Sequence, residues 1–331
     1  MRLFFGCGPR PRCDYPLIFL PANRLIAAFI KARYNPARFI KQNFVRDYAC
    51  FQGEEMKTYQ QIFTELKRPA LVPFFVLGDP DEERSFGYIK AAIDAGADIL
   101  ELGVAFSDPI ADGPTIQAAD MRALAAGVTV DKALRLVRRV KDYRDIPIGL
   151  LMYYNLIEHH GRERFYAAAA AAGVNSVLVA DLCVDDAEEV AGLARQNGLD
   201  MVFMVTPNTT GARRAQILRL CSGFVYTVSV VGVTGARRDL SAEIGPLIGA
   251  LKAETRAPVC VGFGVSRPEH ARALAAAGAD GVIVGSAVVE IIARNLQDQA
   301  RGIMEMTAYI RQMRQALENK SFPLQDRFNR K

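Results

Sequence analysis

The residues with the clearest potential for chemistry are the acidic side chains of Glu101, Asp108 and Asp112. Glu101 alternates with Ile99 in an apolar run, so on a strand both side chains face the same side, and a buried carboxylate is costly unless it is paired or used. Asp108 and Asp112 follow in a loop that contains Pro and Gly. A carboxyl group at the mouth of a barrel can serve general acid/base catalysis when burial raises its pKa. We therefore expect acid/base work at Glu101, while a structural loop-capping role stays open for Asp108.

A metal site is an alternative interpretation of these three acids. Oxygen-ligand metal sites need more convergent ligands than this stretch supplies, and no histidine lies within it. We expect no metal.

Glycines follow two apolar runs near the end of the chain, as Gly262-Phe263-Gly264 and Gly285-Ser286-Ala287. Exposed backbone N–H groups at such glycines can bind an anion, and Ser286 could begin a helix whose positive end faces it. A third Gly-rich stretch, residues 229–237, is long enough to act as a lid, although a plain surface loop would also fit.

The elements that must position these residues alternate between short apolar runs and amphipathic segments, which is typical of parallel βα units. Helical stretches such as residues 131–142 and 163–172 lie between the runs. This order favours a closed (β/α)₈ TIM barrel over an open sheet, with the active site in the loops that follow the strands. The eight predicted strands are Leu71–Val76, Ile99–Gly103, Pro147–Leu151, Ser176–Ala180, Met201–Val205, Phe224–Val228, Val259–Gly262 and Val282–Val284.

A weak internal repeat supports the barrel. Residues 95–98, 172–175 and 277–280 read Ala-Gly-Ala-Asp, Ala-Gly-Val-Asn and Ala-Gly-Ala-Asp, each ahead of an apolar run. Each glycine is predicted to end a helix with a positive φ angle, as helix punctuation without a role in ligand binding.

The first 55 residues differ in composition from the rest. They hold nine Lys and Arg against four Asp and Glu, whereas the remainder holds 32 of each sign (41 less 9 and 36 less 4). Ten of the 29 Phe and Tyr lie here, but no Ser or Thr, which argues against a transit peptide. We expect 1–55 to be a poorly ordered extension or an over-long start, 56–320 the catalytic barrel, and 321–331 a tail.

Several classes of protein are disfavoured by composition. No apolar run approaches the roughly 18 residues of a membrane span. The balanced charge of the main domain suggests neither a nucleic-acid groove nor a polybasic membrane face. The six cysteines show no C-x-x-C or Cys/His spacing, so free thiols in the cytoplasm are the simplest interpretation.

From about residue 56 to 317, the chain resembles the tryptophan synthase alpha chain family. The stretch from Glu101 through Gln117 carries the resemblance most specifically. Supporting motifs are Leu77-Gly78-Asp79-Pro80, Gly149-Leu150-Leu151-Met152-Tyr153, Val179-Ala180-Asp181, Gly232-Val233-Thr234-Gly235-Ala236 and the two glycine loops.

The resemblance implies reversible cleavage of indole-3-glycerol phosphate into indole and glyceraldehyde 3-phosphate. Indole would pass to a beta chain that carries pyridoxal phosphate, in an α2β2 assembly, and this chain would need no cofactor of its own. By motif position, Glu101 matches the general acid/base, Asp112 the carboxylate at the indole N–H, Tyr226 a supporting tyrosine, and Thr234 a lid residue. Gly235, Gly264, Gly285 and Ser286 match the phosphate site. The apolar walls of the indole pocket match Phe74, Leu151, Tyr153, Leu178, Ala180, Phe263 and Ile283.

The chain departs from the family pattern at four positions. Ala105 and Cys183 replace prolines on loops that meet the beta chain, Val230 replaces a polar lid residue, and Val76 replaces a threonine. Partner coupling and lid closure are therefore less certain than the chemistry. The open alternatives are a free-standing indole-releasing lyase, another phosphate-binding barrel of aromatic or histidine biosynthesis, and a non-catalytic allosteric partner of a beta chain.

Overall fold

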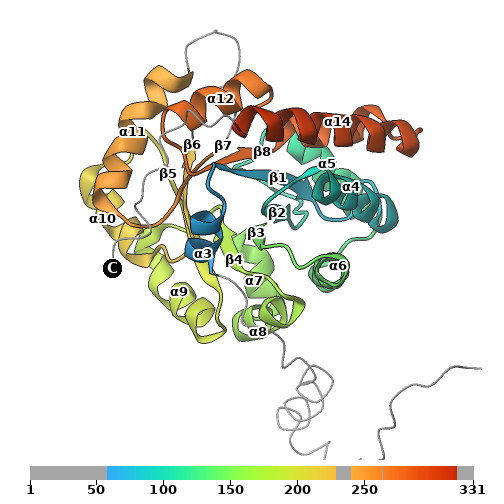
Figure 1. The fold of residues 1–331 in the computed structure, drawn as a ribbon. Coiled ribbons are helices and arrows are strands. Elements are labelled where there is room, and N and C mark those ends of the chain that lie inside the picture. Colours follow the sequence, from blue (N-terminus) through green and yellow to red (C-terminus); the bar gives the residue numbers. More distant parts are fainter. Residues whose placement is uncertain (1–57, 229–239, 263, 319–331) are drawn as a thin grey trace, which may run out of the picture. The chain divides into compact units, whose positions relative to one another are not determined.

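In the computed structural model, residues 58–228, 240–262 and 264–318 are described. Within them, eight strands form a closed barrel in sequence order, with β1 paired to β8 and every pairing parallel (Figure 1). This confirms the predicted fold class. The strands are β1 Ala70–Val76, β2 Leu100–Gly103, β3 Ile148–Met152, β4 Ser176–Val179, β5 Asp200–Val205, β6 Val225–Val228, β7 Val259–Gly262 and β8 Gly281–Val284.

Helices surround the barrel. Both helical stretches predicted from the sequence are confirmed, as α6 and α8. In chain order the helices are α3 Tyr59–Glu65, α4 Glu82–Ala95, α5 Pro114–Ala125, α6 Val130–Tyr143, α7 Tyr154–His160, α8 Arg162–Ala172, η1 Val184–Asp186, α9 Ala187–Gln196, α10 Gly211–Leu220, α11 Leu240–Glu254, α12 Pro268–Ala276, α13 Ser286–Arg294 and α14 Gln299–Leu317.

The predicted strand bounds agree with the structure to within one residue at each end. For example, the second strand begins at Leu100 instead of Ile99, and the fourth ends at Val179 instead of Ala180. Such differences arise because a strand ends where its ladder hydrogen bonds end, which apolarity alone does not define.

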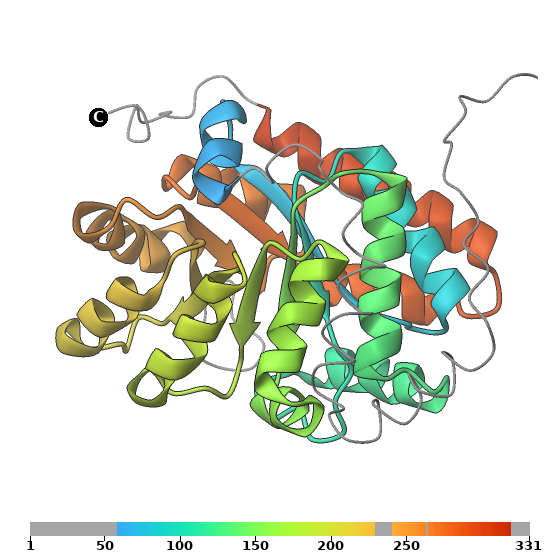
Figure 2. The same cartoon turned by 90° about the horizontal axis from the view of Figure 1, so that it is seen from below.

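The apolar core has two layers, because barrel strands alternate their side chains between the lumen and the surrounding helices. All seven residues of β1 are buried, as expected for a strand covered on both faces. Helix α3 closes one end of the barrel, and the strands run away from it (Figure 2). Its Tyr59 ring is in the lumen cluster, and the Tyr59 hydroxyl lies 2.9 Å from the Ser176 hydroxyl.

The three repeated glycines have the predicted backbone conformation. Gly96, Gly173 and Gly278 follow α4, α8 and α12 with φ angles of 108°, 91° and 94°. Their role as helix punctuation is confirmed.

The acid or amide two residues after each repeated glycine has a structural role that the sequence analysis missed. Asp98 accepts the Leu71 N–H at 2.8 Å, Asn175 the Ile148 N–H at 3.0 Å, and Asp280 the Val259 N–H at 2.8 Å. Each side chain therefore fastens a helix-to-strand turn to the start of the neighbouring strand. We call these three residues the strand clips.

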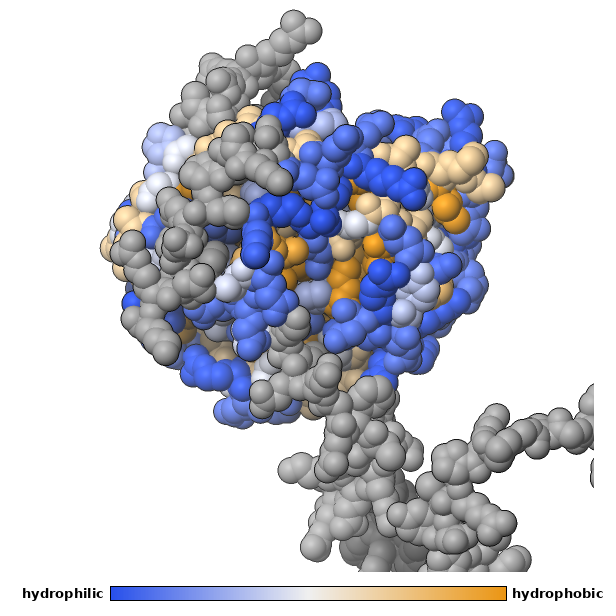
Figure 3. All heavy atoms as spheres, viewed as in Figure 1, coloured by the Kyte–Doolittle hydropathy of each residue, from blue (hydrophilic) through white to orange (hydrophobic). Residues whose placement is uncertain are grey.

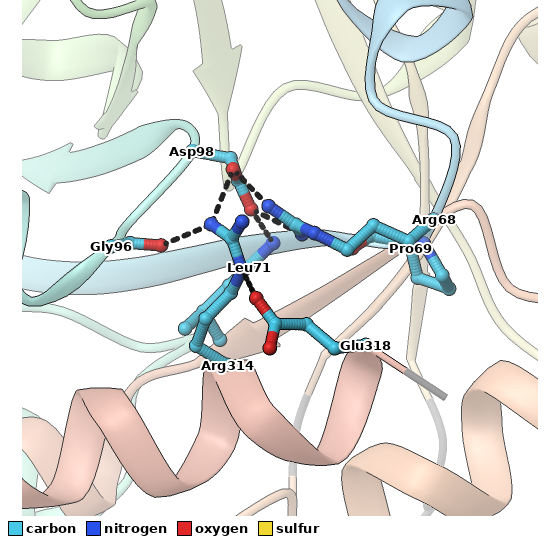
Figure 4. A network of polar contacts seen from close by, with 7 residues as sticks. All are labelled: Arg68, Pro69, Leu71, Gly96, Asp98, Arg314 and Glu318. Atoms are coloured by element: carbon cyan, nitrogen blue, oxygen red, sulfur yellow. Dashed lines mark hydrogen bonds and ion pairs between the residues drawn. The ribbon is translucent and has the colours of Figure 1, made fainter. Parts of the chain in front are cut away.

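The clip at Asp98 also joins the last helix to the barrel. Arg68 donates to both Asp98 oxygens, at 2.7 and 2.8 Å, and Arg314 on α14 donates to Oδ1 at 3.2 Å (Figure 4). Arg314 also donates to the Gly96 carbonyl at 3.1 Å. Helix α14, which packs along α4 and α12, is thereby fixed to the end of the barrel that α3 covers.

The surface on the face of Figure 1 is mostly hydrophilic, and apolar residues show mainly in gaps between polar ones (Figure 3). Among the helices of the described part of the chain, none is long and apolar enough to cross a membrane.

Candidate active site

Glu101 is placed by the second strand of the barrel. In the parallel register it pairs with Phe74 on β1 and with Gly149 on β3. Its side chain is buried, with 4% of the residue exposed. Glu101 also lines a cavity of about 10 Å³, together with Ser176 and apolar residues. The predicted inward orientation of Glu101 is confirmed.

The surroundings of Glu101 favour its protonated form. Burial raises the pKa of this carboxyl to about 8, and the negative charge of Asp112 adds to the rise. Within the part of the chain that the structure describes, no arginine or lysine opposes the shift. Near neutral pH, Glu101 therefore carries a proton that it can donate.

Asp112 lies in the segment between β2 and α5, and its surroundings differ from those of Glu101. Tyr153 donates its hydroxyl to Asp112 Oδ2 at 2.7 Å, and the same hydroxyl accepts the Ala111 N–H at 3.0 Å. Burial raises the pKa of Asp112, and the hydrogen bond from Tyr153 opposes the rise. The ring of Tyr153 stacks on Phe106, with ring centroids 5.1 Å apart. The segment thus supplies a carboxylate held by a buried tyrosine.

Tyr226 on β6 faces the same part of the lumen. It is 4% exposed, and an added Cβ at Gly262 on β7 would lie within 2.7 Å of its ring atom Cζ, so only glycine leaves room for this ring. Burial raises the pKa of Tyr226, and the charge of Glu101 is the second cause. The structure therefore brings together Glu101, Asp112, Tyr153 and Tyr226.

The predicted anion site lies at the ends of β7 and β8. Gly264 has a φ angle of 74°, and Gly285 is the N-cap of α13, whose first residue is Ser286. The hydrogen bonds of this helix begin at the Val288 N–H, so the Ser286 and Ala287 N–H groups have no partner within it. This end of α13 therefore has N–H donors and the positive end of the helix dipole, a combination that suits an anion. Gly235 and Thr234 lie outside the described residues.

The predicted indole-pocket residues occupy two connected apolar clusters. Leu178, Ala180 and Ile283 are in the lumen cluster, Phe74 is in the cluster above it, and Leu151 contacts both. Tyr153 is 2% exposed and belongs to neither cluster, and its ring stacks on Phe106 while its hydroxyl donates to Asp112. Phe263 lies outside the described residues.

Three of the four departures from the family pattern are described. Ala105 and Val76 are buried in the cluster around Phe74. Cys183 is an exposed free cysteine, and Arg213 on α10 donates to its sulfur at 3.1 Å. Val230 lies outside the described residues. The first two substitutions therefore fill apolar space, and the third lies on the surface.

Two further acidic residues near the site were given no role in the sequence analysis. Asp79, fully buried, receives both of its hydrogen bonds from Arg122, at 2.6 and 2.8 Å. Asp120 is 4% exposed and shares the buried stripe of α5 with Ile116 and Ala123. An acid at helical spacing within an apolar stripe is the signal that could have found Asp120.

The arrangement can move protons beside an apolar pocket. A protonated carboxyl and a second carboxylate with its own hydrogen bond divide the acid and charge-stabilising roles between them. No group of three or more His, Cys, Asp or Glu side chains among the described residues is arranged to hold a metal ion.

Comparisons with known proteins place the chain among related sequences. The family model described as "Tryptophan synthase alpha chain" matches residues 61–318. A tryptophan synthase alpha chain from Methanothermobacter thermautotrophicus is 50% identical over 75% of this chain and 92% of the relative. One from Methanoregula boonei is 45% identical over 80% of this chain and 99% of the relative.

Solved structures agree with the sequence comparison. Tryptophan synthase subunit alpha from Legionella pneumophila has a TM-score of 0.73 and 32% identity, over 80% of this chain and 100% of that chain. A chain of the tryptophan synthase α2β2 complex from Pyrococcus furiosus has a TM-score of 0.66 and 36% identity, over 74% of this chain and 97% of that chain.

Proposed function

Because the chain belongs to the tryptophan synthase alpha chain family, we propose that Glu101 and Asp112 carry out the reversible cleavage of indole-3-glycerol phosphate into indole and glyceraldehyde 3-phosphate. The observation that carries the assignment is the buried carboxyl of Glu101, which no cation among the described residues neutralises and whose pKa is raised to about 8. A carboxylic acid with this pKa can deliver a proton at neutral pH.

The bond that breaks joins indole C3 to the glycerol carbon that bears a hydroxyl. When Glu101 protonates C3, the ring becomes an iminium ion that can accept the electron pair of the carbon–carbon bond. Removal of the hydroxyl proton by a base then yields the aldehyde and neutral indole. Protons and electrons balance without an oxidant or a metal, so general acid/base catalysis suffices for the step.

Asp112 has the complementary role. Positive charge grows on the indole nitrogen when C3 is protonated, and a carboxylate that accepts the indole N–H stabilises this charge. Tyr153 occupies Oδ2 of Asp112, so Oδ1 remains to accept the indole N–H. Tyr226 fills the lumen beside Glu101 and limits the positions that the ring can adopt.

The two ends of the substrate would be held by different forces. The ring would lie among Phe74, Leu151, Leu178 and Ile283, which are apolar. The phosphate would bind the N–H groups at Gly264, Gly285 and Ser286, with Gly235 as the fourth predicted position. Binding at both ends fixes the scissile bond against Glu101 and so lowers the entropic part of the barrier.

The partner we propose is a beta chain with bound pyridoxal phosphate, in an α2β2 assembly in the cytoplasm. The support is the likeness to the Pyrococcus furiosus α2β2 complex. This chain's own residues hold no cofactor in the proposed reaction.

The test is indole release by the full chain, with Glu101→Gln beside the exposed control Glu163→Gln on α8. We expect the Glu101 variant to lose activity by about 10²–10⁴-fold. It should keep its affinity for indole-3-propanol phosphate, which lacks the hydroxyl whose proton is removed when the carbon–carbon bond breaks. Retained turnover would remove Glu101 from the mechanism. Assays with and without a beta chain separate a subunit, active with its partner, from a free-standing lyase and from a scaffold that only activates the partner.

A further inference from the structure

Three polar side chains follow neighbouring strands at the end of the barrel that holds the site. Asp112 follows β2, Tyr153 follows β3, and Asp181 follows β4. In a barrel of parallel strands, the loops that follow the strands all lie at one end. The Ala180 N–H donates to the Met152 carbonyl at 2.8 Å, so the backbones of β3 and β4 stay paired up to the residue before Asp181. The three loops are therefore within reach of one another.

Helix α7 begins directly after β3, and its first turn is capped from the neighbouring loop. Tyr153 is the N-cap residue, but its own side chain makes no capping hydrogen bond. The first N–H groups of a helix have no acceptor within it. Oδ1 of Asp181 accepts the Tyr154 N–H at 2.7 Å. Asp181 thus supplies the capping contact that the N-cap residue does not make itself.

The Tyr153 side chain, which is not used for capping, points to the site. Its hydroxyl donates to Asp112 Oδ2 at 2.7 Å and accepts the Ala111 N–H at 3.0 Å. Its ring is 2% exposed and stacks on Phe106 with an interplanar angle of 26°. One hydroxyl therefore contacts both the carboxylate of Asp112 and the backbone just before it. Two hydrogen bonds and one peptide link lead from Asp181 to the carboxylate proposed to meet the indole N–H.

The position of the second Asp112 oxygen depends on the Tyr153 hydroxyl. The terminal torsion of an aspartate has broad energy wells, so an unheld carboxylate can turn. With Oδ2 held, Oδ1 keeps one position for the indole N–H. A misplacement of about 1 Å at a catalytic group can cost about 100-fold in rate.

We propose that Asp181 is a positioning residue for the reaction, which acts through Tyr153 on Asp112. It holds the Tyr154 N–H and with it the start of α7, so that the Tyr153 hydroxyl stays against Asp112. It does not touch the reacting atoms. The kinetic part of the proposal rests on the proposed function, whereas the contacts that hold the tyrosine do not.

The experiment uses three variants and one matched control. Asp181→Ala removes the acceptor, Asp181→Asn keeps an amide oxygen that can accept the same N–H, and Tyr153→Phe removes the hydroxyl but keeps the ring. The control is Tyr143→Phe, because the Tyr143 hydroxyl also donates to a carboxylate, that of Asp94 at 2.7 Å, but between α6 and α4. Steady-state indole release and amide hydrogen exchange at Ala111 are measured on the full chain.

We expect Tyr153→Phe to lower kcat by about tenfold to hundredfold with little change in KM, because an unheld Asp112 weakens transition-state stabilisation. Asp181→Ala should lower kcat by about threefold to tenfold, since the tyrosine remains but is less fixed. Both variants should speed exchange at Ala111, whose N–H the Tyr153 hydroxyl accepts. Asp181→Asn and Tyr143→Phe should stay within about twofold of the unchanged chain in kcat and exchange.

The double variant tests whether Asp181 acts through Tyr153. When the hydroxyl is already absent, Asp181→Ala should lower kcat by no more than about a further twofold. Losses that multiply in full would overturn the proposed route.

The acidic side of the kcat profile gives a readout that a merely structural role would not move. The hydrogen bond from Tyr153 lowers the pKa of Asp112, so its loss raises the pH below which Asp112 is protonated and inactive. Tyr153→Phe and Asp181→Ala should both move the acidic fall of kcat to higher pH, and Asp181→Asn should not. The variants leave unchanged the other titratable groups that interact with the charge of Asp112, which are Glu101 on β2, Asp120 on α5 and Tyr226 on β6.

Unchanged kcat and unchanged Ala111 exchange in Asp181→Ala would overturn the proposal. Equal losses in Asp181→Ala and Asp181→Asn, or an acidic fall that stays in place in Asp181→Ala, would also overturn it. If Asp181→Ala fails to fold, Asp181→Leu, which also lacks an acceptor, replaces it. If the unchanged chain releases no indole, the proposed function fails, while exchange at Ala111 still decides whether Asp181 holds Tyr153.

Discussion

The carboxylates at the two ends of the barrel differ in their charged partners. At the end that α3 closes, Asp98 receives Arg68, Arg314 and a backbone N–H (Figure 4), and Asp280 receives Lys252 at 2.7 Å. At the other end, Glu101 and Asp120 are each 4% exposed, and no described Lys or Arg contributes to the pKa shift of either. Cations neutralise Asp98 and Asp280 at the first end. At the other end Asp79 is also paired, with Arg122, whereas Glu101 and Asp120 can change protonation.

Because of this difference, we expect the paired acids to contribute to stability and the unpaired acids to contribute to activity. Removing one partner from a buried ion pair is strongly destabilising, because it leaves an uncompensated charge. Removing a buried acid that has no cation beside it removes the free-energy cost of burying its charge. Such a change lowers activity without lowering stability. Barrel enzymes place their catalytic groups at the ends where the strands terminate, and stabilising contacts at the opposite end. The contrast predicts mutations with opposite effects at the two ends.

The largest expected effect is at Glu101. Glu101→Gln should abolish indole release and raise the melting temperature at neutral and alkaline pH, because the amide has no charge to bury. Activity assays and calorimetry on the same preparation check both effects. A variant that is inactive and also less stable would mean that Glu101 supports the fold, contrary to the contrast between the two ends.

The opposite end should respond in the opposite way. Asp98→Ala removes the carboxylate that Arg68 and Arg314 share, and we expect a loss of about 3 kcal/mol in the free energy of unfolding. Chemical denaturation gives this value. The kcat of the folded fraction should stay within about twofold, since the change lies far from the transferred proton. A large fall in kcat would contradict the separation of roles.

The pH dependence should reveal the cation-free acids. The folded-state pKa of Glu101 is raised to about 8 and that of Asp120 to about 7, so each favours the folded state at low pH, and this stability is lost as the pH rises through those values. The Asp120→Asn variant should therefore gain melting temperature over the unchanged chain at pH 8, and less at about pH 5.

We also expect kcat to decrease at alkaline pH. As Glu101 loses its proton above pH 8, kcat should fall by about tenfold per pH unit. A flat profile up to about pH 10 would show that a group other than a carboxylic acid donates the proton.

The smallest expected effect is at the neutral strand clip. Asn175→Ala removes the acceptor of the Ile148 N–H, and we expect a loss of about 1–2 kcal/mol, because no charged partner is abandoned. Chemical denaturation gives the loss in the free energy of unfolding for this variant and for Asp98→Ala. The difference between the two losses is the contribution of the ion pairs at Asp98, beyond that of the hydrogen bond to the backbone. Equal losses would mean that the arginines contribute little.

The fold could be predicted almost entirely from the sequence, because strand periodicity, helix-ending glycines and the order of the elements agree with one another. The inward orientation and raised pKa of Glu101 could also be predicted, since a lone acid in an apolar strand allows few alternatives. Asp120 was missed because the buried residues of α5 are not consecutive in the sequence. Their common face is recognised only when the residues are placed at helical spacing. The partners of Asp98 could not be found because Arg314 lies 216 residues away in the chain, and side-chain pairing over that separation leaves no local pattern.

The strand clips have a consequence for the order in which the molecule assembles. The hydrogen bonds of Asp98, Asn175 and Asp280 span only 27, 27 and 21 residues, whereas closure of the barrel joins β1 to β8 across most of the chain. Because the entropy lost on closing a loop rises with its length, short loops close at lower cost. We expect single βα units to acquire their turns early during refolding, with circular closure as the late and slower event.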